Sequence, residues 1–285
     1  MIRDVIHFCL SCMLLSCAVE TRSEGPAQKS EGKYVFVGES FSLRMAPTQS
    51  AEDAGFELNE EQIISPTLFA TDEDGVRWLG WTEGGKKVWA PEPLIAFVAE
   101  ENVHPGNLSI GEERVDRWRA LPLDYRPDDM RPIKSRWNYY PDRECLMRAE
   151  AAGKAEALFS AAAEAGLQLR VVSSFRPASV QRDLYLNKIK SAGYAQQAVA
   201  RPGNSEHQLG TAMDINGLDE DSLVVQSFGE TAEGQWVKEN CQRFGFVVSY
   251  TESNTALTGY EAEPWHLRYV GIEKAANWQA LGPVK

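Results

Sequence analysis

The chain has 285 residues, of which 43% are hydrophobic and 25% charged, so it is long enough to bury a core in one large or two modest domains. Its formal net charge of −12 argues against nucleic-acid binding, which needs clustered Lys and Arg opposite the phosphates. The same acidic balance favours solubility and says little else about partners. We therefore expect an ordinary globular protein that binds no nucleic acid.

The first 17 residues have the features of an export signal. A short apolar run at residues 5–15 follows Arg3 and is too short to span a bilayer. It ends in Leu14-Leu15-Ser16-Cys17, which resembles a bacterial lipobox and makes Cys17 the expected site of lipidation. A signal peptide cleaved nearby without lipidation is the alternative. We expect an exported lipoprotein, anchored in the membrane through Cys17 and facing the periplasm or cell wall.

Cleavage at this point leaves Cys145 and Cys241 as the unmodified cysteines. They are far apart in the sequence, and the presence of two cysteines does not by itself establish that they are in contact. We expect two separate buried thiols, with a disulfide as the alternative in an oxidising compartment.

A flexible tether and a small all-β module are expected to follow. Residues 18–32 are rich in Ser, Glu, Gly and Lys, a composition typical of a tether. Residues 33–98 contain short β-rich runs separated by turns, among them the hairpin signal Asp74-Gly75. Because no helical period of useful length appears there, we predict an all-β fold for this segment.

The β module resembles the bacterial SH3-like domains. Leu43-Arg44-Met45-Ala46-Pro47 corresponds to the Arg-containing strand and Pro-containing loop of that family, and Gly85-Lys86-Lys87-Val88-Trp89-Ala90 to its closing hairpin, with Val88 in place of a glycine. The resemblance implies a small barrel that binds the glycan or peptide of the cell wall. A module that only spaces or packs against the next domain is the alternative. Either ligand binding or core packing accounts for Trp78, Trp81 and Trp89.

A charged connector at residues 99–120 separates this module from a second domain at 121–285. Alanine-rich helical spacing over 144–165, closed by Gly166, predicts its first helix. Further predicted elements are a strand at 167–174, a helix at 179–190 with Val180, Leu184 and Ile189 on one side, a helix at 236–244, and strands at 246–250 and 265–270. This mixture without steady alternation predicts an α+β fold, with a small antiparallel sheet and flanking helices.

We expect His207, Asp214 and His266 to hold one Zn²⁺ ion. The first two lie in Ser205-Glu206-His207-Gln208-Leu209-Gly210-Thr211-Ala212-Met213-Asp214 and the third ends Glu263-Pro264-Trp265-His266. Two histidines and one carboxylate leave a position of a tetrahedral zinc ion open, which is typical of catalytic sites. The small residues 210–212 let the chain turn between the first two ligands. On the last strand, the two-residue period puts His266 and Arg268 on one face.

Glu263 is the expected general base. It lies three residues before His266, and Pro264 is expected to hold the backbone between them extended. A carboxylate there can take a proton from a metal-activated water and return it to the departing amine. A solvated loop glutamate is the alternative for Glu263. Glu206 is the rival base, although in an extended segment it would point away from its neighbour His207.

Arg176 is the expected substrate-facing cation. It lies in Ser173-Ser174-Phe175-Arg176-Pro177, between a predicted strand and a predicted helix, and hence on a turn at the sheet edge. Its guanidinium can bind a substrate carboxylate or stabilise an oxyanion, with a surface salt bridge as the alternative. Gln181 and Ser205 are candidates for hydrogen bonds to the substrate or to the ligands.

Together the motifs resemble the VanY-type D-Ala-D-Ala carboxypeptidases, zinc peptidases of the peptidoglycan. The likeness covers about residues 121–271, includes Tyr125-Arg126-Pro127 and Thr258-Gly259-Tyr260, and departs from the family at Pro177, where a serine is more usual. It implies the same roles for the residues named above, which are ligands at His207, Asp214 and His266, a base at Glu263 and a substrate-facing Arg176.

The resemblance implies that the C-terminal D-amino acid is removed from peptidoglycan stem peptides by a metal-activated water. An L,D-carboxypeptidase, a D,D-dipeptidase and a wall endopeptidase share the same zinc core and remain alternatives. A degenerate lipoprotein that only binds the cell wall is the non-enzymatic alternative.

Overall fold

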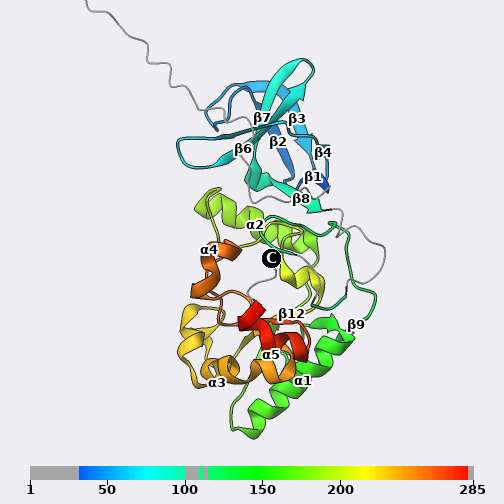
Figure 1. Cartoon of the computed structure of the whole chain (residues 1–285), viewed down its shortest axis with the longest axis vertical. Helices are drawn as coiled ribbons and strands as arrows, with labels where there is room; N and C mark the ends of the chain where they lie inside the picture. Colours follow the sequence, from blue (N-terminus) through cyan, green and yellow to red (C-terminus); the bar gives the residue numbers. More distant parts are fainter. Residues whose placement is uncertain (1–31, 100–108, 112–114, 282–285) are drawn as a thin grey trace, which may run out of the picture.

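A computed structural model describes residues 32–99, 109–111 and 115–281 of the chain. The expected signal with Cys17 and nearly all of the expected tether lie outside the described residues. The rest forms two units stacked along the long axis of the molecule, an all-β unit and a mixed α/β unit (Figure 1). In the part of the chain that is described, no helix combines the length and apolar character needed to cross a bilayer.

The N-terminal unit is all β, as predicted, but its strands do not close into a barrel. Five of them form an antiparallel sheet in the order β3-β2-β7-β6-β5, and three form a second sheet in the order β4-β1-β8. Among the described residues the consecutive strands β1 and β2 pair with different partners, so the sheets stay separate. The strands are β1 Gly32–Phe36, β2 Ser40–Arg44, β3 Asp53–Asn59, β4 Ile63–Ile64, β5 Leu68–Thr71, β6 Arg77–Glu83, β7 Lys86–Pro91 and β8 Ile95–Ala99.

The expected hairpin at Asp74-Gly75 joins β5 to β6. Asp72 closes its turn by accepting hydrogen bonds from the backbone N–H groups of Asp74 and Val76, at 3.1 and 2.8 Å. The other carboxylate oxygen of Asp72 accepts from Trp78 Nε1 at 2.8 Å. Trp78, Trp81 and Trp89 are at most 6% exposed, so these tryptophans belong to the core of the unit.

The second unit has the α+β fold predicted from the sequence. Its main sheet has four antiparallel strands in the order β11-β12-β14-β13, and a separate ladder pairs β10 with β9. The strands are β9 Met130–Pro132, β10 Leu146–Arg148, β11 Arg170–Ser173, β12 Ala212–Asn216, β13 Phe246–Val248 and β14 His266–Tyr269. The helices are α1 Ala149–Glu164, α2 Ala178–Ala192, α3 Ala232–Asn240, α4 Thr255–Thr258 and α5 Ile272–Leu281.

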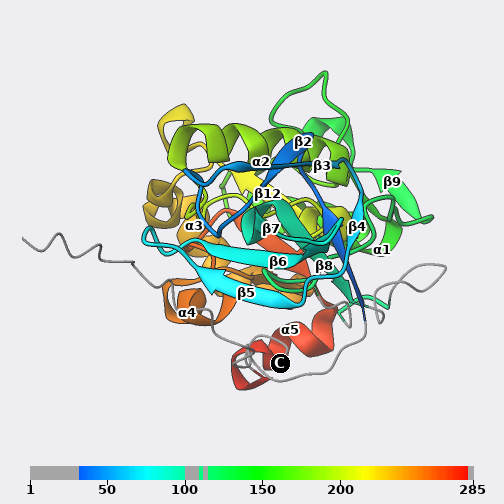
Figure 2. The same cartoon turned by 90° about the horizontal axis from the view of Figure 1, so that it is seen from above.

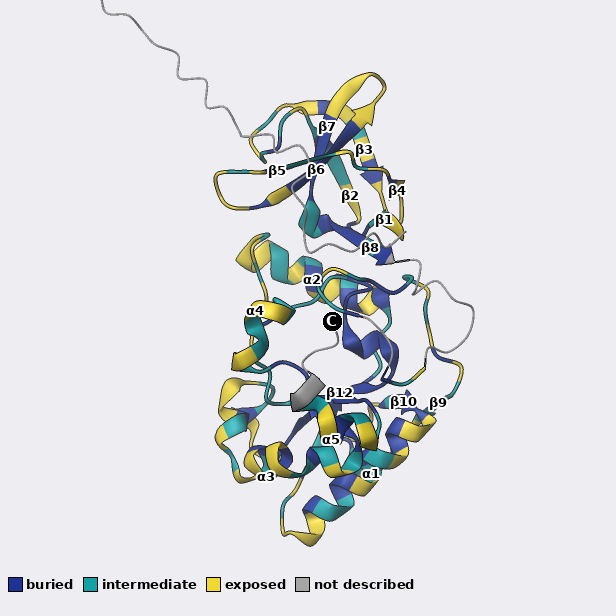
Figure 3. Ribbon diagram, in the orientation of Figure 1, coloured by how far each residue is buried: buried dark blue, intermediate teal, exposed yellow. Residues whose placement is uncertain are grey.

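The core of this unit lies between α1 and the main sheet. Leu158 and Phe159 of α1 are fully buried in one cluster with Met213 of β12 and Leu267 of β14. The buried inner side of α1 and its exposed outer side are visible in Figure 3. Residues Cys145 and Cys241 also belong to this core and are both free, so the expectation of two separate buried thiols is confirmed.

Two predicted helices differ from the structure in instructive ways. The first begins at Ala149 instead of 144, because residues 146–148 pair as β10 with β9. On α2 the buried side carries Gln181 and Tyr185, whereas Val180 and Leu184 are 47% and 44% exposed. Of the three apolar residues expected on one side, Ile189 alone packs against the β core, because the inner side of α2 is partly polar and makes hydrogen bonds to backbone carbonyls.

Candidate metal and catalytic centre

A short 3₁₀ helix, Glu206–Leu209, holds His207 in place. Ser205 caps this helix, with its Oγ accepting from His207 N at 3.3 Å, so its observed role is to shape the turn. The helix ends at Gly210, whose φ of +72° is the left-handed conformation that favours glycine. The chain then enters β12 at once, which brings Asp214 to the same place.

The imidazole of His207 is oriented by the backbone just after β11. Its Nδ1 lies 2.7 Å from the carbonyl oxygen of Ser174. Because a carbonyl can only accept, Nδ1 carries the proton, and Nε2 presents its lone pair to the site. This Nε2 lies 3.2 Å from Asp214 Oδ2.

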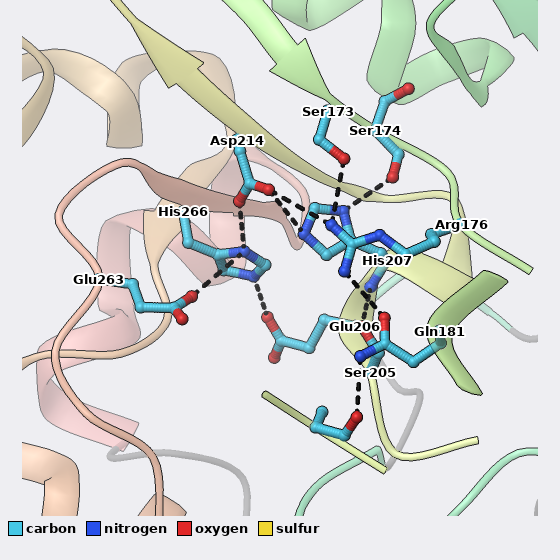
Figure 4. Close-up of polar contacts among 11 residues, drawn as sticks. Ser173, Ser174, Arg176, Gln181, Ser205, Glu206, His207, Asp214, Glu263 and His266 are labelled. Atoms are coloured by element: carbon cyan, nitrogen blue, oxygen red, sulfur yellow. Dashed lines mark hydrogen bonds and ion pairs between the residues drawn. The ribbon is translucent and has the colours of Figure 1, made fainter. Parts of the chain in front are cut away.

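Strand register brings the other two expected ligands together. Asp214 of β12 lies directly opposite His266 of β14 and opposite Ser173 of β11. Across this pair, His266 Nδ1 lies 3.1 Å from Asp214 Oδ1. One ligand atom from each of His207, Asp214 and His266 lies within 4.8 Å of the others, and all three residues are buried (Figure 4). Two neutral imidazole nitrogens and one carboxylate oxygen suit Zn²⁺.

Glu206 lies on the site side, contrary to the expectation from the sequence. The 3₁₀ turn, in place of an extended segment, directs its carboxylate to His266, where Oε2 accepts from Nε2 at 3.0 Å. Its Oε1 accepts from Arg268 at 2.8 Å, and all three residues are buried. Sequence reasoning therefore missed a residue that orients a candidate ligand. The sequence signal for this role was the placement of His266 and Arg268 on one face of a strand. When two such side chains are buried together, a carboxylate between them is expected.

The electrostatics of the centre favour positive charge. Burial opposes a charged imidazole at His266. Asp214 and Glu206 nevertheless accept hydrogen bonds from the two nitrogens of this ring and raise the pKa of His266 to about 10. Burial likewise opposes a charged Glu206, but Arg268 and His266 lower the pKa of that carboxyl to about 2. A divalent cation meets the same negative surroundings, so the residues present fit a bound metal ion.

Glu263 lies beside the three candidate ligands, with Oε2 at 3.8 Å from His266 Nδ1. The segment between them is a tight turn closed by the His266 N–H to Glu263 carbonyl bond of 3.0 Å, and not the extended backbone expected around Pro264. Burial, with the Asp214 and Glu206 carboxylates nearby, raises the pKa of Glu263 to about 7. A carboxyl with that pKa can both accept and release a proton near neutral pH.

Arg176 reaches the same centre from the turn between β11 and α2. Its Nη2 donates to Ser173 Oγ at 3.1 Å and lies 3.6 Å from Asp214 Oδ2, while its Nη1 donates to Gln181 Oε1 at 2.8 Å (Figure 4). Its backbone N–H also donates to the His207 carbonyl at 3.2 Å. The structure thus brings Arg176 and Gln181 together with the candidate ligands and Glu263.

Known proteins resemble this chain in the unit that carries the centre. The model of the VanY family, described as D-alanyl-D-alanine carboxypeptidase, matches residues 144–272. "Putative carboxypeptidase YodJ" of Bacillus subtilis is 38% identical over 166 residues, which cover 57% of this chain and 60% of that protein. The chain thus spans less than two thirds of that relative.

Two further known proteins are matched over a larger share of their own length. The bifunctional D-Ala-D-Ala dipeptidase and D-Ala-D-Ala carboxypeptidase VanXYC of Enterococcus gallinarum is 35% identical over 140 residues, 47% of this chain and 72% of that protein. The solved structure of the LdcB LD-carboxypeptidase has a TM-score of 0.54 and 36% identity, and the match covers 58% of this chain and 79% of that one. The β unit lies outside the range of the family model, so its likeness to SH3-like domains stays a prediction.

Replacing Glu206 tests its role in orienting His266. Glu206→Gln keeps the shape of the side chain but removes the charge that fixes the ring, so we expect metal affinity to fall about 10- to 100-fold. Competition with a chromogenic chelator measures this directly. Glu252→Gln, on an exposed turn of the same unit, is the control and should bind metal as the wild type does. Unchanged affinity in Glu206→Gln would contradict the assignment.

Proposed function

We propose, because this chain belongs to the VanY family of D-alanyl-D-alanine carboxypeptidases, that it is a zinc-dependent carboxypeptidase of peptidoglycan. In this proposal it removes the C-terminal D-amino acid from stem peptides. The observation that carries the proposal is the convergence of His207, Asp214 and His266 within 4.8 Å, with Glu263 next to them.

His207, Asp214 and His266 would hold one zinc ion. When bound, Zn²⁺ polarises a scissile carbonyl and makes a water molecule acidic enough to be deprotonated near neutral pH. Glu206 and the Ser174 carbonyl keep the two imidazole rings turned toward the ion through hydrogen bonds to their other nitrogens.

Glu263 is the proposed proton carrier of the reaction. As the carboxylate it accepts a proton from the attacking water, and as the acid it passes that proton to the nitrogen of the departing D-amino acid. A pKa of about 7, raised by burial, supports both halves of this cycle. Its side chain is 22% exposed, against 7% for Glu206, so Glu263 is the more accessible to water and substrate.

Arg176 is the proposed partner of the terminal carboxylate. The Gln181 and Ser173 hydrogen bonds hold its guanidinium beside the candidate ligands. A fixed guanidinium binds a carboxylate through two parallel hydrogen bonds, which favours cleavage of the last residue over cleavage inside a chain. That preference supports a carboxypeptidase over an endopeptidase.

An L,D-carboxypeptidase is the second candidate on the same centre. The similarity to the structure of the LdcB LD-carboxypeptidase, at 36% identity, favours it. The two candidates differ in the residue that precedes the scissile bond, and both use the same metal ligands, base and arginine.

For the whole chain we propose an exported lipoprotein that acts at the cell wall. The lipobox-like sequence ending in Cys17 supports anchoring to the membrane. The SH3-like sequence motifs of the β unit support binding of wall glycan or peptide by that unit. Anchoring would keep the centre close to its polymeric substrate.

Removing the proposed base separates chemistry from metal binding. Glu263→Gln should retain zinc in full and lose at least about 10²-fold in kcat, because the proton carrier is lost and no ligand is. Steady-state release of D-alanine and metal analysis provide the two measurements. Glu261→Gln, two residues earlier and exposed, should remain fully active. A Glu263→Gln enzyme that keeps its turnover would refute the role.

Digestion of purified muropeptides tests the function itself. We expect the pentapeptide to lose its terminal D-alanine, the reaction to stop with a chelator, and Zn²⁺ to restore it. Mass spectrometry of the products identifies the bond that is cut. Cleavage of the tetrapeptide alone would select the L,D-carboxypeptidase, and cleavage of cross-linked dimers would select an endopeptidase. Activity that persists in the chelator would reject the zinc mechanism.

A further inference from the structure

We propose that the β unit is a structural part of the catalytic centre, and that Arg201 is a positioning residue through which it holds Gln181 and Arg176. The proposal rests on the role suggested above for Arg176 in binding the substrate carboxylate. It assigns the β unit a task in substrate binding that is independent of any wall ligand of its own.

Gln181 connects Arg176 to the rest of the structure, because both the oxygen and the nitrogen of its buried amide form hydrogen bonds. Its Oε1 accepts from Arg176 Nη1 at 2.8 Å, and its Nε2 donates to the carbonyl oxygen of Ala200 at 2.8 Å. The residue is 2% exposed, so bulk solvent has little access to either hydrogen bond. The position of the Ala200 carbonyl therefore sets the orientation of the amide, and with it the position of the arginine.

The next residue after Ala200 is bound to the β unit. Arg201 donates from Nη1 to the carbonyl oxygens of Glu92 and Ile95, at 3.0 and 2.6 Å. It also donates from Nη2 to the carbonyl of Arg117 at 2.5 Å. A planar guanidinium with several fixed acceptors has little freedom to move, so the backbone at Ala200 is tied to the start of β8.

Helix α2, which carries Gln181, is docked on the same unit. Tyr185 is buried and donates from its hydroxyl to the carbonyl of Pro93 at 2.8 Å. Arg182 forms an ion pair with Glu60, and Leu186 and Ile189 pack against the β core. The views in Figures 1 and 2 place α2 directly against the β unit. Gln181 and its acceptor, the Ala200 carbonyl, are thus both positioned by contacts with one surface.

The resulting chain of contacts runs from the β unit through Arg201, the Ala200 carbonyl and Gln181 to Arg176. The candidate metal ligands are held differently, by the pairing of β12 with β14 and by the Ser174 carbonyl. Loss of Arg201 should therefore weaken binding of the substrate carboxylate and leave metal binding intact. Such a defect should raise KM more than it lowers kcat.

Arg201→Ala tests this arrangement in the full-length zinc enzyme. We expect KM for the cleaved muropeptide to rise about 10-fold or more, since small displacements of a positioning group have large effects, with zinc content unchanged. Added guanidinium should partly restore KM. Tyr185→Phe, which removes one hydroxyl and leaves the packing, should raise KM in the same direction but less. Arg77→Ala is the control, because it breaks an exposed ion pair with Glu92 on the same segment.

Hydrogen exchange gives a readout that does not depend on catalysis. Amides of residues 176–185 should exchange faster in Arg201→Ala and in Tyr185→Phe, while those of β12 stay protected. If the wild-type protein cleaves no muropeptide while the two variants still exchange faster than it does, the proposed function is rejected and the positioning role is kept. Unchanged exchange and unchanged KM in both variants would overturn the role of Arg201. A fall of both kcat and zinc content in Arg201→Ala would also overturn it, because that result indicates general destabilisation of the protein.

Discussion

The pairing of β12 with β14 is the constraint on which the candidate centre depends. In that ladder Asp214 faces His266, and the neighbouring pair Met213–Leu267 is fully buried on the core side. A slip of one residue would move the apolar pair to the site and the ligands into the core. Burial of the apolar side chains therefore fixes the register, and the register fixes the distance between a carboxylate and an imidazole. The hydrophobic core in this way sets the geometry of a polar site.

The polar side of the same sheet carries several charged groups, each of which would be energetically costly to bury without a partner. Three carboxylates, Asp214, Glu206 and Glu263, surround His266, and two guanidiniums, Arg176 and Arg268, lie against them. Buried charges need partners, and breaking one pair leaves the other group uncompensated. With neutral histidines the carboxylates outnumber the guanidiniums, and a bound cation offsets that excess. The arrangement is consistent with a fold whose stability and metal binding are linked.

The sequence predicted that His207, Asp214 and His266 come together, because zinc chemistry permits few residue types and the motifs supply them. It failed where orientation depended on backbone conformation. Glu206 faces the site because its segment is a 3₁₀ turn, and Gln181 faces inward because its hydrogen-bond acceptor comes from a distant loop. Neither fact has a local signature. For the β unit, local patterns predicted the strands, whereas the pairing into two sheets depends on contacts far apart in the chain.

The two sides of the centre are held by different parts of the molecule. His207, Asp214 and His266 are fixed by the 3₁₀ turn and the main sheet, both inside the second unit. Arg176 and Gln181 are fixed at the junction with the β unit, through α2 and the residues around Ala200. The reaction type then depends on the sheet, which tolerates little change without loss of the metal. The proposed binding of the substrate carboxylate depends on the junction, where small shifts of α2 alter the position of one guanidinium without changing the strand pairing that holds Asp214 and His266. The carboxylate-binding side of the centre can therefore shift while the metal-binding side keeps its geometry.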